Sequence, residues 1–186
     1  MKNPNDNPWY VLMTLHGEQT GDEIDHELHQ KNRDSWNTFM QNRISSNIEG
    51  QLARRGYSLK KRMNSSDAME SSDASFLSAW RKRHGGEPPA IVIRNLGSEI
   101  EMKEHSFPNN FVLSGMLLPV TIDFNGSIFD RNMLLDNVPL CAQVVAKDAQ
   151  FCGNLNISNS YFESRFYLSG SNITGCLLYT SDAADE

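Results

Sequence analysis

The chain has 186 residues, of which 39% are hydrophobic and 22% are charged, and its formal net charge at pH 7 is −6. These values are typical of a folded globular chain, and the negative charge argues against general nucleic-acid binding. No run of about 18 apolar residues occurs, so the sequence predicts no membrane span. Residues 1–8 lack the apolar run of a secretory signal, and the chain has only three cysteines, so we expect a cytoplasmic location.

Residues 1–62 are predicted to form a helical N-terminal region. The apolar run Pro8–Leu15 is too short to classify as helix or strand from its periodicity. Asp22–Met40 places apolar side chains on one face and charged ones on the other, which predicts an amphipathic helix. A second helix is expected to start at the capping box Ser46–Glu49 and to stop at Gly56.

Residues 63–89 are predicted to be a linker that contains a short helix. The stretch 64–75 is small and polar, which is typical of a linker. Asp73 is expected to cap a short helix that carries Phe76, Leu77 and Trp80 and has Gly85 just past its end. Ala90–Arg94 is predicted to be the first strand of the next domain, which spans residues 90–175.

From Met102 to Gly175 the sequence repeats every 11 residues. Two apolar columns follow each other at alternating steps of five and six positions, a spacing that matches no helix. The predicted core consists of Leu113, Phe124, Leu135, Ala146, Ile157 and Leu168 in one column and Leu118, Phe129, Leu140, Phe151, Phe162 and Ile173 in the other. Turn formers recur between the columns, namely Gly115, Gly126, Asn137, Gly153, Asn159 and Gly170. The pattern predicts a solenoid of very short strands, in which each repeat buries its apolar face by stacking on the next.

Segments such as Asp148–Gly153 and Asn159–Glu163 resemble the pentapeptide-repeat family, whose units read small, polar, Leu or Phe, and two variable residues. The resemblance implies a mainly β fold, a right-handed quadrilateral β-helix. Two 11-residue units would make one coil of four short sides, so that equivalent positions of alternate units stack. The helices at residues 1–62 also resemble the segment that precedes the repeats in some bacterial members of this family.

Several residues beside the core columns should point outward although they are apolar. They are Val112, Leu117, Ile128, Leu134, Val145, Tyr161 and Tyr167. Contiguous apolar surface usually marks an interface, which would make these residues a binding surface for a protein partner. Alternatively, the N-terminal helices fold back and cover them with Trp36, Phe39 and Trp80.

No residue pattern indicates catalysis, a cofactor or a metal. His26 and His29 are three positions apart, whereas the helical zinc motif needs four. The spacing of Cys141 and Cys152 would place them on different sides of a coil, which disfavours a disulfide. The basic runs could contact phosphate or an acidic partner, although a solvated face and a helix C-cap explain them equally well; they are Arg54–Arg55, Lys60–Arg62 and Arg81–His84.

The sequence therefore favours a non-catalytic scaffold that binds a protein partner and not nucleic acid directly, with a homodimer through an open solenoid end as a further expectation. Some pentapeptide-repeat proteins instead mimic DNA and bind type II topoisomerases. A mimic about 16 Å long would need on the order of nine negative charges, whereas residues 102–175 carry six acids and four bases. A β-helical carbohydrate-active enzyme is also disfavoured, because the acids are scattered rather than clustered.

Residues 176–186 resemble the conceptual translation of a transposase-type sequencing adapter. The resemblance implies that the natural chain is truncated near Gly175 and that order ends there. The alternative is a further coil, because Leu177 and Tyr179 continue the apolar columns. Asp182 argues against a coil, since it would place an unpaired carboxylate at an inward position.

Overall fold

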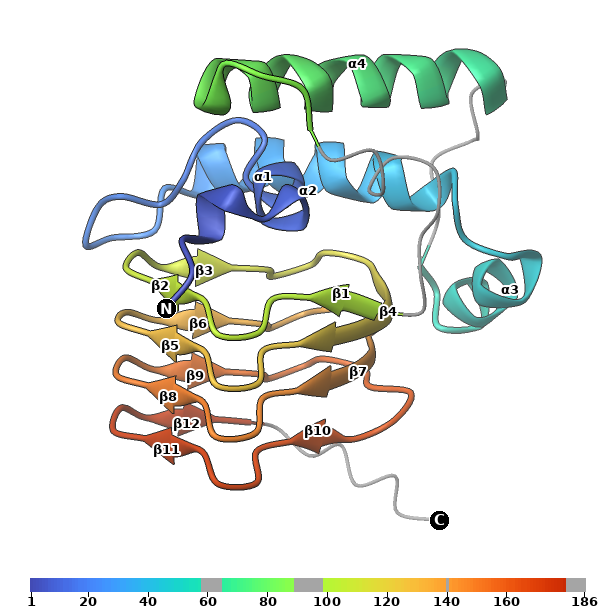
Figure 1. The fold of residues 1–186 in the computed structure, drawn as a ribbon. Coiled ribbons are helices and arrows are strands. Elements are labelled where there is room, and N and C mark those ends of the chain that lie inside the picture. The colour runs from blue at the N-terminus through green and yellow to red at the C-terminus, as the bar shows by residue number, and fades with distance from the viewer. Residues whose placement is uncertain (58–64, 89–98, 140, 180–186) are drawn as a thin grey trace.

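The computed structural model describes residues 1–57, 65–88, 99–139 and 141–179, with helices in the first half and short strands in the second (Figure 1). The helices are η1 (Pro4–Asp6), α1 (Pro8–Met13), α2 (His26–Gln41), α3 (Ser46–Arg54) and α4 (Ser65–His84). The strands are β1 (Glu99–Glu101), β2 (Ser106–Phe107), β3 (Phe111–Val112), β4 (Leu118–Asp123), β5 (Ile128–Phe129), β6 (Met133–Leu134), β7 (Cys141–Val145), β8 (Gln150–Phe151), β9 (Leu155–Asn156), β10 (Phe166–Tyr167), β11 (Asn172–Ile173) and β12 (Leu177–Leu178). Within the described ranges, no helix is long and apolar enough to cross a membrane.

The strands form a parallel β-solenoid of about four coils. Sheet 1 has the order β1-β4-β7-β10, sheet 2 the order β11-β8-β5-β2, and sheet 3 the order β12-β9-β6-β3. Partners in these sheets are separated by one coil of two repeat units, as in the pairs Ile100 with Ile122 and Phe129 with Phe151. The predicted fold class and the coil of two repeat units are confirmed.

The predicted core columns point into the solenoid. The rings of Phe107, Phe129 and Phe151 stack on one another, with centroids 4.7 and 4.9 Å apart and planes within 6° and 1° of parallel. Leu113, Leu118, Phe124, Phe129, Leu135, Ala146 and Phe151 are buried. Ile157, Phe162, Leu168 and Ile173 are partly buried and pack against this core. Burial therefore decreases toward the last described coil.

The fourth side of the coil, which leads from sheet 3 to sheet 1 and contains Leu117 and Tyr161, departs from the predicted register. Leu118 pairs with Cys141, one position later than the repeat predicts, and Cys141 bridges to Phe162, one position earlier. The predicted ladder of Leu118, Leu140 and Phe162 is therefore wrong at its middle position, where the buried Cys141 stands. Leu140 itself lies outside the described residues.

Pro139 gives a physical reason for this shift. At the equivalent places in the flanking coils, the backbone N–H of Leu117 donates to Asn37 Oδ1 at 2.8 Å and that of Tyr161 to the Val138 carbonyl at 3.0 Å. Proline has no N–H to donate, so the coil cannot repeat this contact at Pro139. The following residues are displaced by one position before the regular register returns at Gln143.

A left-handed residue closes one turn in every repeat unit. These residues, with positive φ, are Glu104, Gly115, Gly126, Asn137, Asp148, Asn159 and Gly170. Glycine, asparagine and aspartate adopt this conformation most readily, which explains most of the series. Gly153, predicted as a turn former, is not among them, and Asp148 occupies the position that the repeat requires.

Gly153 is needed for a different reason, which is close packing between coils. A Cβ atom on this residue would lie 2.4 Å from the backbone carbon of Arg131 in the coil before it. We expect Gly153→Ala to lower the free energy of unfolding by about 1–3 kcal/mol, because the backbone must shift to make room. Gly50→Ala in α3 is the control, since nothing lies within 4 Å of its Cβ position. Equal melting temperatures for both variants in a thermal melt would contradict this account.

The helices close the N-terminal end of the solenoid, with α1 and α2 lying across the first coil (Figure 1). The ring of Tyr10 in α1 lies 5.7 Å from Phe107 and 5.5 Å from Phe111. Trp36 in α2 is fully buried, and its Nε1–H donates to the Leu117 carbonyl at 2.6 Å. The apolar end of the solenoid, which would otherwise face solvent, is thereby covered.

The N-terminal region also supplies hydrogen-bond partners for backbone groups of the first coil, which has no preceding coil to pair with. Asn37 Oδ1 accepts from the N–H of Leu117 at 2.8 Å, and Asn37 Nδ2 donates to the Gly115 carbonyl at 3.0 Å. Lys2 forms a parallel bridge with His105, and Gln19 an antiparallel bridge with Asn110. Open sheet edges are sites of aggregation, so these contacts protect the first coil.

Tertiary contacts also change the predicted helix boundaries. Helix α2 begins at His26 and not at Asp22, because Gln19 bonds both the N–H and the carbonyl of Asp25 and holds it in an extended conformation as the N-cap. Ser45 rather than Ser46 caps α3.

The predicted linker at residues 64–75 is wrong, because α4 begins at Ser65. The capping role predicted for Asp73 is wrong for the same reason. Asp73 lies inside a long helix, where its carboxylate accepts from Arg43 at 2.8 Å. This ion pair and the buried Phe76 fix the middle of α4, from which a helix extends at little further cost. The predicted strand Ala90–Arg94 lies outside the described residues.

Strand β12 continues the coil past Gly175. Leu177 pairs with Leu155, and the N–H of Cys176 donates to Asn154 Oδ1 at 2.9 Å. The expectation that order ends at Gly175 is therefore wrong for residues 176–179, while residues 180–186 lie outside the described ranges. The adapter-like origin of this segment stays a prediction.

Candidate functional site

The outward apolar residues do not form one surface. Val112 and Leu134 lie on sheet 3, Ile128 on sheet 2, Val145 and Tyr167 on sheet 1, and Leu117 and Tyr161 on the fourth side. The predicted contiguous patch is corrected, because consecutive columns fall on successive sides of the coil. Only positions separated by whole coils share a side.

The N-terminal cap covers part of this set. Leu117 is buried against Trp36 and Asn37, and Val112 is also buried. Tyr161, in contrast, is 42% exposed. The alternative that the helices cover the outward residues therefore holds for Leu117 and in part for Tyr161, because Arg55 at the end of α3 lies over one face of the Tyr161 ring and the rest stays exposed.

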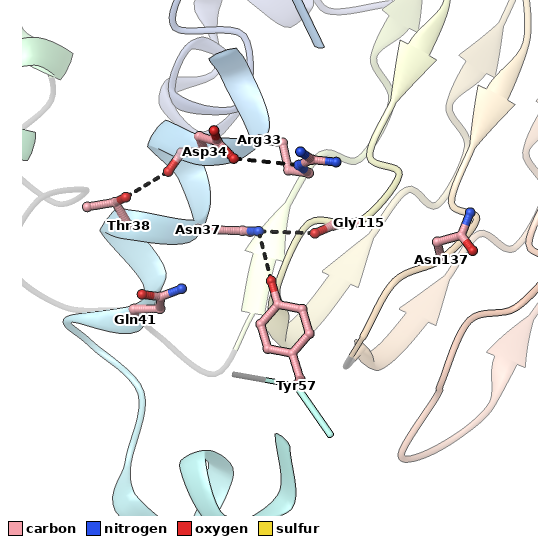
Figure 2. A pocket seen from close by; sticks show the side chains of 8 residues that line it. All are labelled: Arg33, Asp34, Asn37, Thr38, Gln41, Tyr57, Gly115 and Asn137. Atoms are coloured by element: carbon pink, nitrogen blue, oxygen red, sulfur yellow. Dashed lines mark hydrogen bonds and ion pairs between the residues drawn. The ribbon is translucent and has the colours of Figure 1, made fainter. Parts of the chain in front are cut away.

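The fourth side carries two polar pockets where helices stand beside it. The first, the α2 pocket, has a volume of about 350 Å³ and lies between α2 and two solenoid turns (Figure 2). Its lining residues are Arg33, Asp34, Asn37, Thr38, Gln41, Tyr57, Gly115 and Asn137. A volume of this size suits a small polar molecule or one side chain of a partner.

Most polar groups of the α2 pocket already have a structural role. Asn37 bonds the first coil and also donates to the Tyr57 hydroxyl at 3.4 Å (Figure 2). Burial raises the pKa of Tyr57, so the hydroxyl stays protonated. Arg33 is only loosely paired with its neighbour Asp34, at 3.7 Å. The pocket thus presents hydrogen-bond donors but no acid–base pair.

The second pocket, the α3 pocket, has a volume of about 400 Å³ and lies between the end of α3 and the third coil. It is lined by Gln51, Arg54, Arg55, Tyr161 and Glu163. The guanidinium of Arg55 lies over the Tyr161 ring, 3.3 Å from its centroid, which is a cation–π contact. Arg54–Arg55 and Tyr161 lie far apart in the sequence, and only the fold brings them together.

A third pocket of about 650 Å³ lies between the N-terminal segment and the first coil, and Lys103 is one of its lining residues. The Lys103 ammonium group forms ion pairs with three acids. Lys103 Nζ lies 3.1 Å from Asp123, 3.4 Å from Glu99 and 3.4 Å from Glu101. The hydrogen bond to Asp123 contributes most to raising the pKa of Lys103. The three acids therefore surround a cation. Two of them also interact with each other, because burial and a hydrogen bond to Asp123 raise the pKa of Glu99.

The other motifs have structural roles. His29 is buried and bonds the Ser114 carbonyl at 2.8 Å, while His26 is exposed, so the two do not converge. Burial lowers the pKa of His29. Arg83 of the third basic run joins α4 to the loop after α1 by bonding the Thr14 carbonyl. Among the described residues, no group of three or more His, Cys, Asp or Glu could hold a metal ion. Lys60–Arg62 lies outside the described residues.

The three thiols are expected to differ in reactivity. Cys141 is buried, and burial raises the pKa of its thiol to about 12, whereas Cys152 and Cys176 are exposed. Because the thiolate is the reactive form, two thiols should react with a thiol reagent in the native protein at neutral pH and the third only in denaturant. A Cys141→Ser variant should lose only the thiol that reacts in denaturant. Three equal rates in the native protein would contradict the placement of Cys141.

Comparisons of the chain with protein-family models, with curated proteins and with solved structures found no match. The assignment of the solenoid therefore rests on its register, its parallel sheets and its stacked core.

Proposed function

We propose that this protein is a non-catalytic scaffold of the pentapeptide-repeat type, which uses its capped solenoid to hold a protein partner. The repeat length, the left-handed turn residue in each unit and the inward Leu and Phe columns support the family assignment. Stacked parallel coils with a rigid aromatic core give a firm surface whose side chains keep fixed spacing.

The observation that carries the proposal is the shape of the fourth side. The α2 and α3 pockets both open there, and the exposed Tyr161 lines the α3 pocket. Exposed aromatic and arginine side chains beside a pocket are typical of the residues that contribute most to protein binding. The partner is therefore expected to contact the fourth side near α3.

A site-specific crosslinker tests this expectation. A photoreactive phenylalanine analogue at position 161 should capture the partner in extracts of the source cell. The same analogue at position 150 is the control, because Gln150 is exposed on sheet 2, away from the fourth side. Capture of the same protein at equal yield from both positions, or of none from position 161, would contradict the proposal.

A DNA-mimic role predicts a different result. The charges of the repeats favour the scaffold, because bases are interspersed among the acids and Lys103 lies among three acids. We expect the protein not to inhibit DNA supercoiling by a type II topoisomerase at equimolar concentration. Stoichiometric inhibition in that assay would replace the scaffold proposal with the mimic.

A further inference from the structure

We infer that the α3 pocket binds an acidic side chain of a partner's peptide segment, holding its carboxylate with Arg54 and Arg55. This inference rests on the proposed function, since it names the chemistry of the contact that the scaffold makes. It is carried by two guanidinium groups, an aromatic wall and an unpaired amide oxygen at one pocket.

Arg55 is positioned for a carboxylate. Its guanidinium stacks on the Tyr161 ring at 3.3 Å from the centroid. A stacked guanidinium keeps its N–H groups in the plane parallel to the ring, where they are free to donate at the edge. Within the described part of the chain this group forms no hydrogen bond or ion pair, so none of the described residues occupies its donors. Paired N–H donors in a fixed plane match the two oxygens of a carboxylate.

Arg54 adds a second cation from the adjacent position. Its Nε donates to the Gly50 carbonyl at 3.2 Å, which directs the side chain along the end of α3. The two terminal nitrogens form no hydrogen bond or ion pair within the described part of the chain. Together the two arginines can surround one anion from two directions.

The charge of the pocket sets the charge of the ligand. Arg54 and Arg55 contribute two positive charges and Glu163 one negative charge, so the lining carries +1. One carboxylate neutralises this charge. A nucleic-acid strand brings many phosphates close together, and the net charge of −6 on the whole chain would repel it.

Gln51 indicates that the ligand also carries a donor. Its Oε1 is buried and has no hydrogen-bond partner among the described residues. An unpaired buried acceptor is unusual in a folded protein. The backbone N–H beside an aspartate or glutamate would supply this donor when the amide turns toward the ligand, whereas an inorganic anion such as sulfate would not. A peptide therefore fits the pocket better than a simple anion.

Two matched peptides test the inference on the full chain. The probe is a capped five-residue peptide with a central glutamate between glycine and serine residues, and its control has glutamine instead. NMR titration of the arginine Nε–H signals should show shifts at Arg54 and Arg55 with the glutamate peptide only. Arg55→Gln should weaken binding at least about tenfold, because it removes a charge-assisted pair of bonds. Arg81→Gln, which removes an exposed arginine of α4, should leave binding unchanged.

Tyr161→Leu separates positioning from charge. It keeps both arginines but removes the cation–π contact, so we expect binding to weaken about two- to fivefold while the folded state is retained. Equal binding of the glutamine peptide, unchanged binding by Arg55→Gln, or tighter binding of a single-stranded oligonucleotide at the same arginines would overturn the inference.

The crosslinking experiment keeps the two proposals apart. Capture of a partner at position 161 that is unaffected by Arg55→Gln would reject the acidic contact and leave the scaffold function standing. Binding of the glutamate peptide without any captured partner would reject the scaffold function and leave the pocket chemistry standing.

Discussion

Phe151→Asp is expected to prevent folding of the solenoid rather than to remove a local function. Phe151 is buried and its ring stacks on Phe129 with centroids 4.9 Å apart. The substitution removes this contact, leaves a cavity and places an unpaired carboxylate in an apolar core. Loss of a buried phenylalanine alone costs about 3–5 kcal/mol, and the buried charge adds to it. A typical domain is stable by about 5–15 kcal/mol, so most or all of the stability would be lost.

The neighbouring residue provides the control. Gln150 lies on the same strand, β8, but its side chain is exposed. Gln150→Asp should therefore change the melting temperature by only a few degrees, because a surface change usually costs less than about 0.5 kcal/mol. Circular dichroism during thermal unfolding measures both variants. A cooperative melt of Phe151→Asp at the temperature of the unsubstituted chain would show that the inward placement is wrong.

Trp36→Ala is expected to destabilise the cap and the solenoid together. Trp36 is fully buried between α2 and the first coil, and its Nε1–H bonds the Leu117 carbonyl. We expect a loss of about 3–5 kcal/mol, the usual cost of truncating a buried large aromatic side chain. Because the same residue belongs to both parts, urea unfolding followed by circular dichroism should show one transition at lower urea.

Trp36→Phe separates the contribution of the buried ring from that of the hydrogen bond to the Leu117 carbonyl. It retains most of the ring but removes the N–H, so it should cost about 1–3 kcal/mol for the unpaired carbonyl. If the helices of Trp36→Ala unfold in a separate first transition and the solenoid then unfolds at its usual urea concentration, the helices do not stabilise the coils.

The repeat itself could be predicted from the sequence. Core columns at alternating steps of five and six positions favour a coil in which every second repeat unit faces the same side, and Phe129 stacks on Phe151 as this requires. The reason is physical, since each short strand can bury its side chain only against the equivalent side chain of the next coil. The spacing of apolar residues along the sequence therefore predicted contacts between residues in different coils.

The departures from the predicted register and helix boundaries depend on contacts that the spacing of apolar residues does not predict. Pro139 lacks the N–H that the fourth side uses elsewhere, and Cys141 takes the inward place predicted for Leu140. Gln19 fixes the start of α2, and Arg43 pairs with Asp73 inside α4. The Gln19–Asp25 and Arg43–Asp73 contacts join residues 6 and 30 positions apart, so local propensity predicted different helix boundaries.

The candidate site was decided by tertiary structure alone. The sequence identified Arg54–Arg55 as a basic run and Tyr161 as an outward aromatic residue in a distant part of the chain. The columns determined that Tyr161 points outward, but the sequence contained no signal that α3 would stand beside that ring. Helix α3 follows α2, which Trp36 and Asn37 anchor on the first coil, and its own Leu52 is fully buried. The solenoid core could be predicted because its contacts recur at constant sequence spacing. The α3 pocket could not, because it arises from one contact between a helix and the solenoid that occurs nowhere else in the repeat.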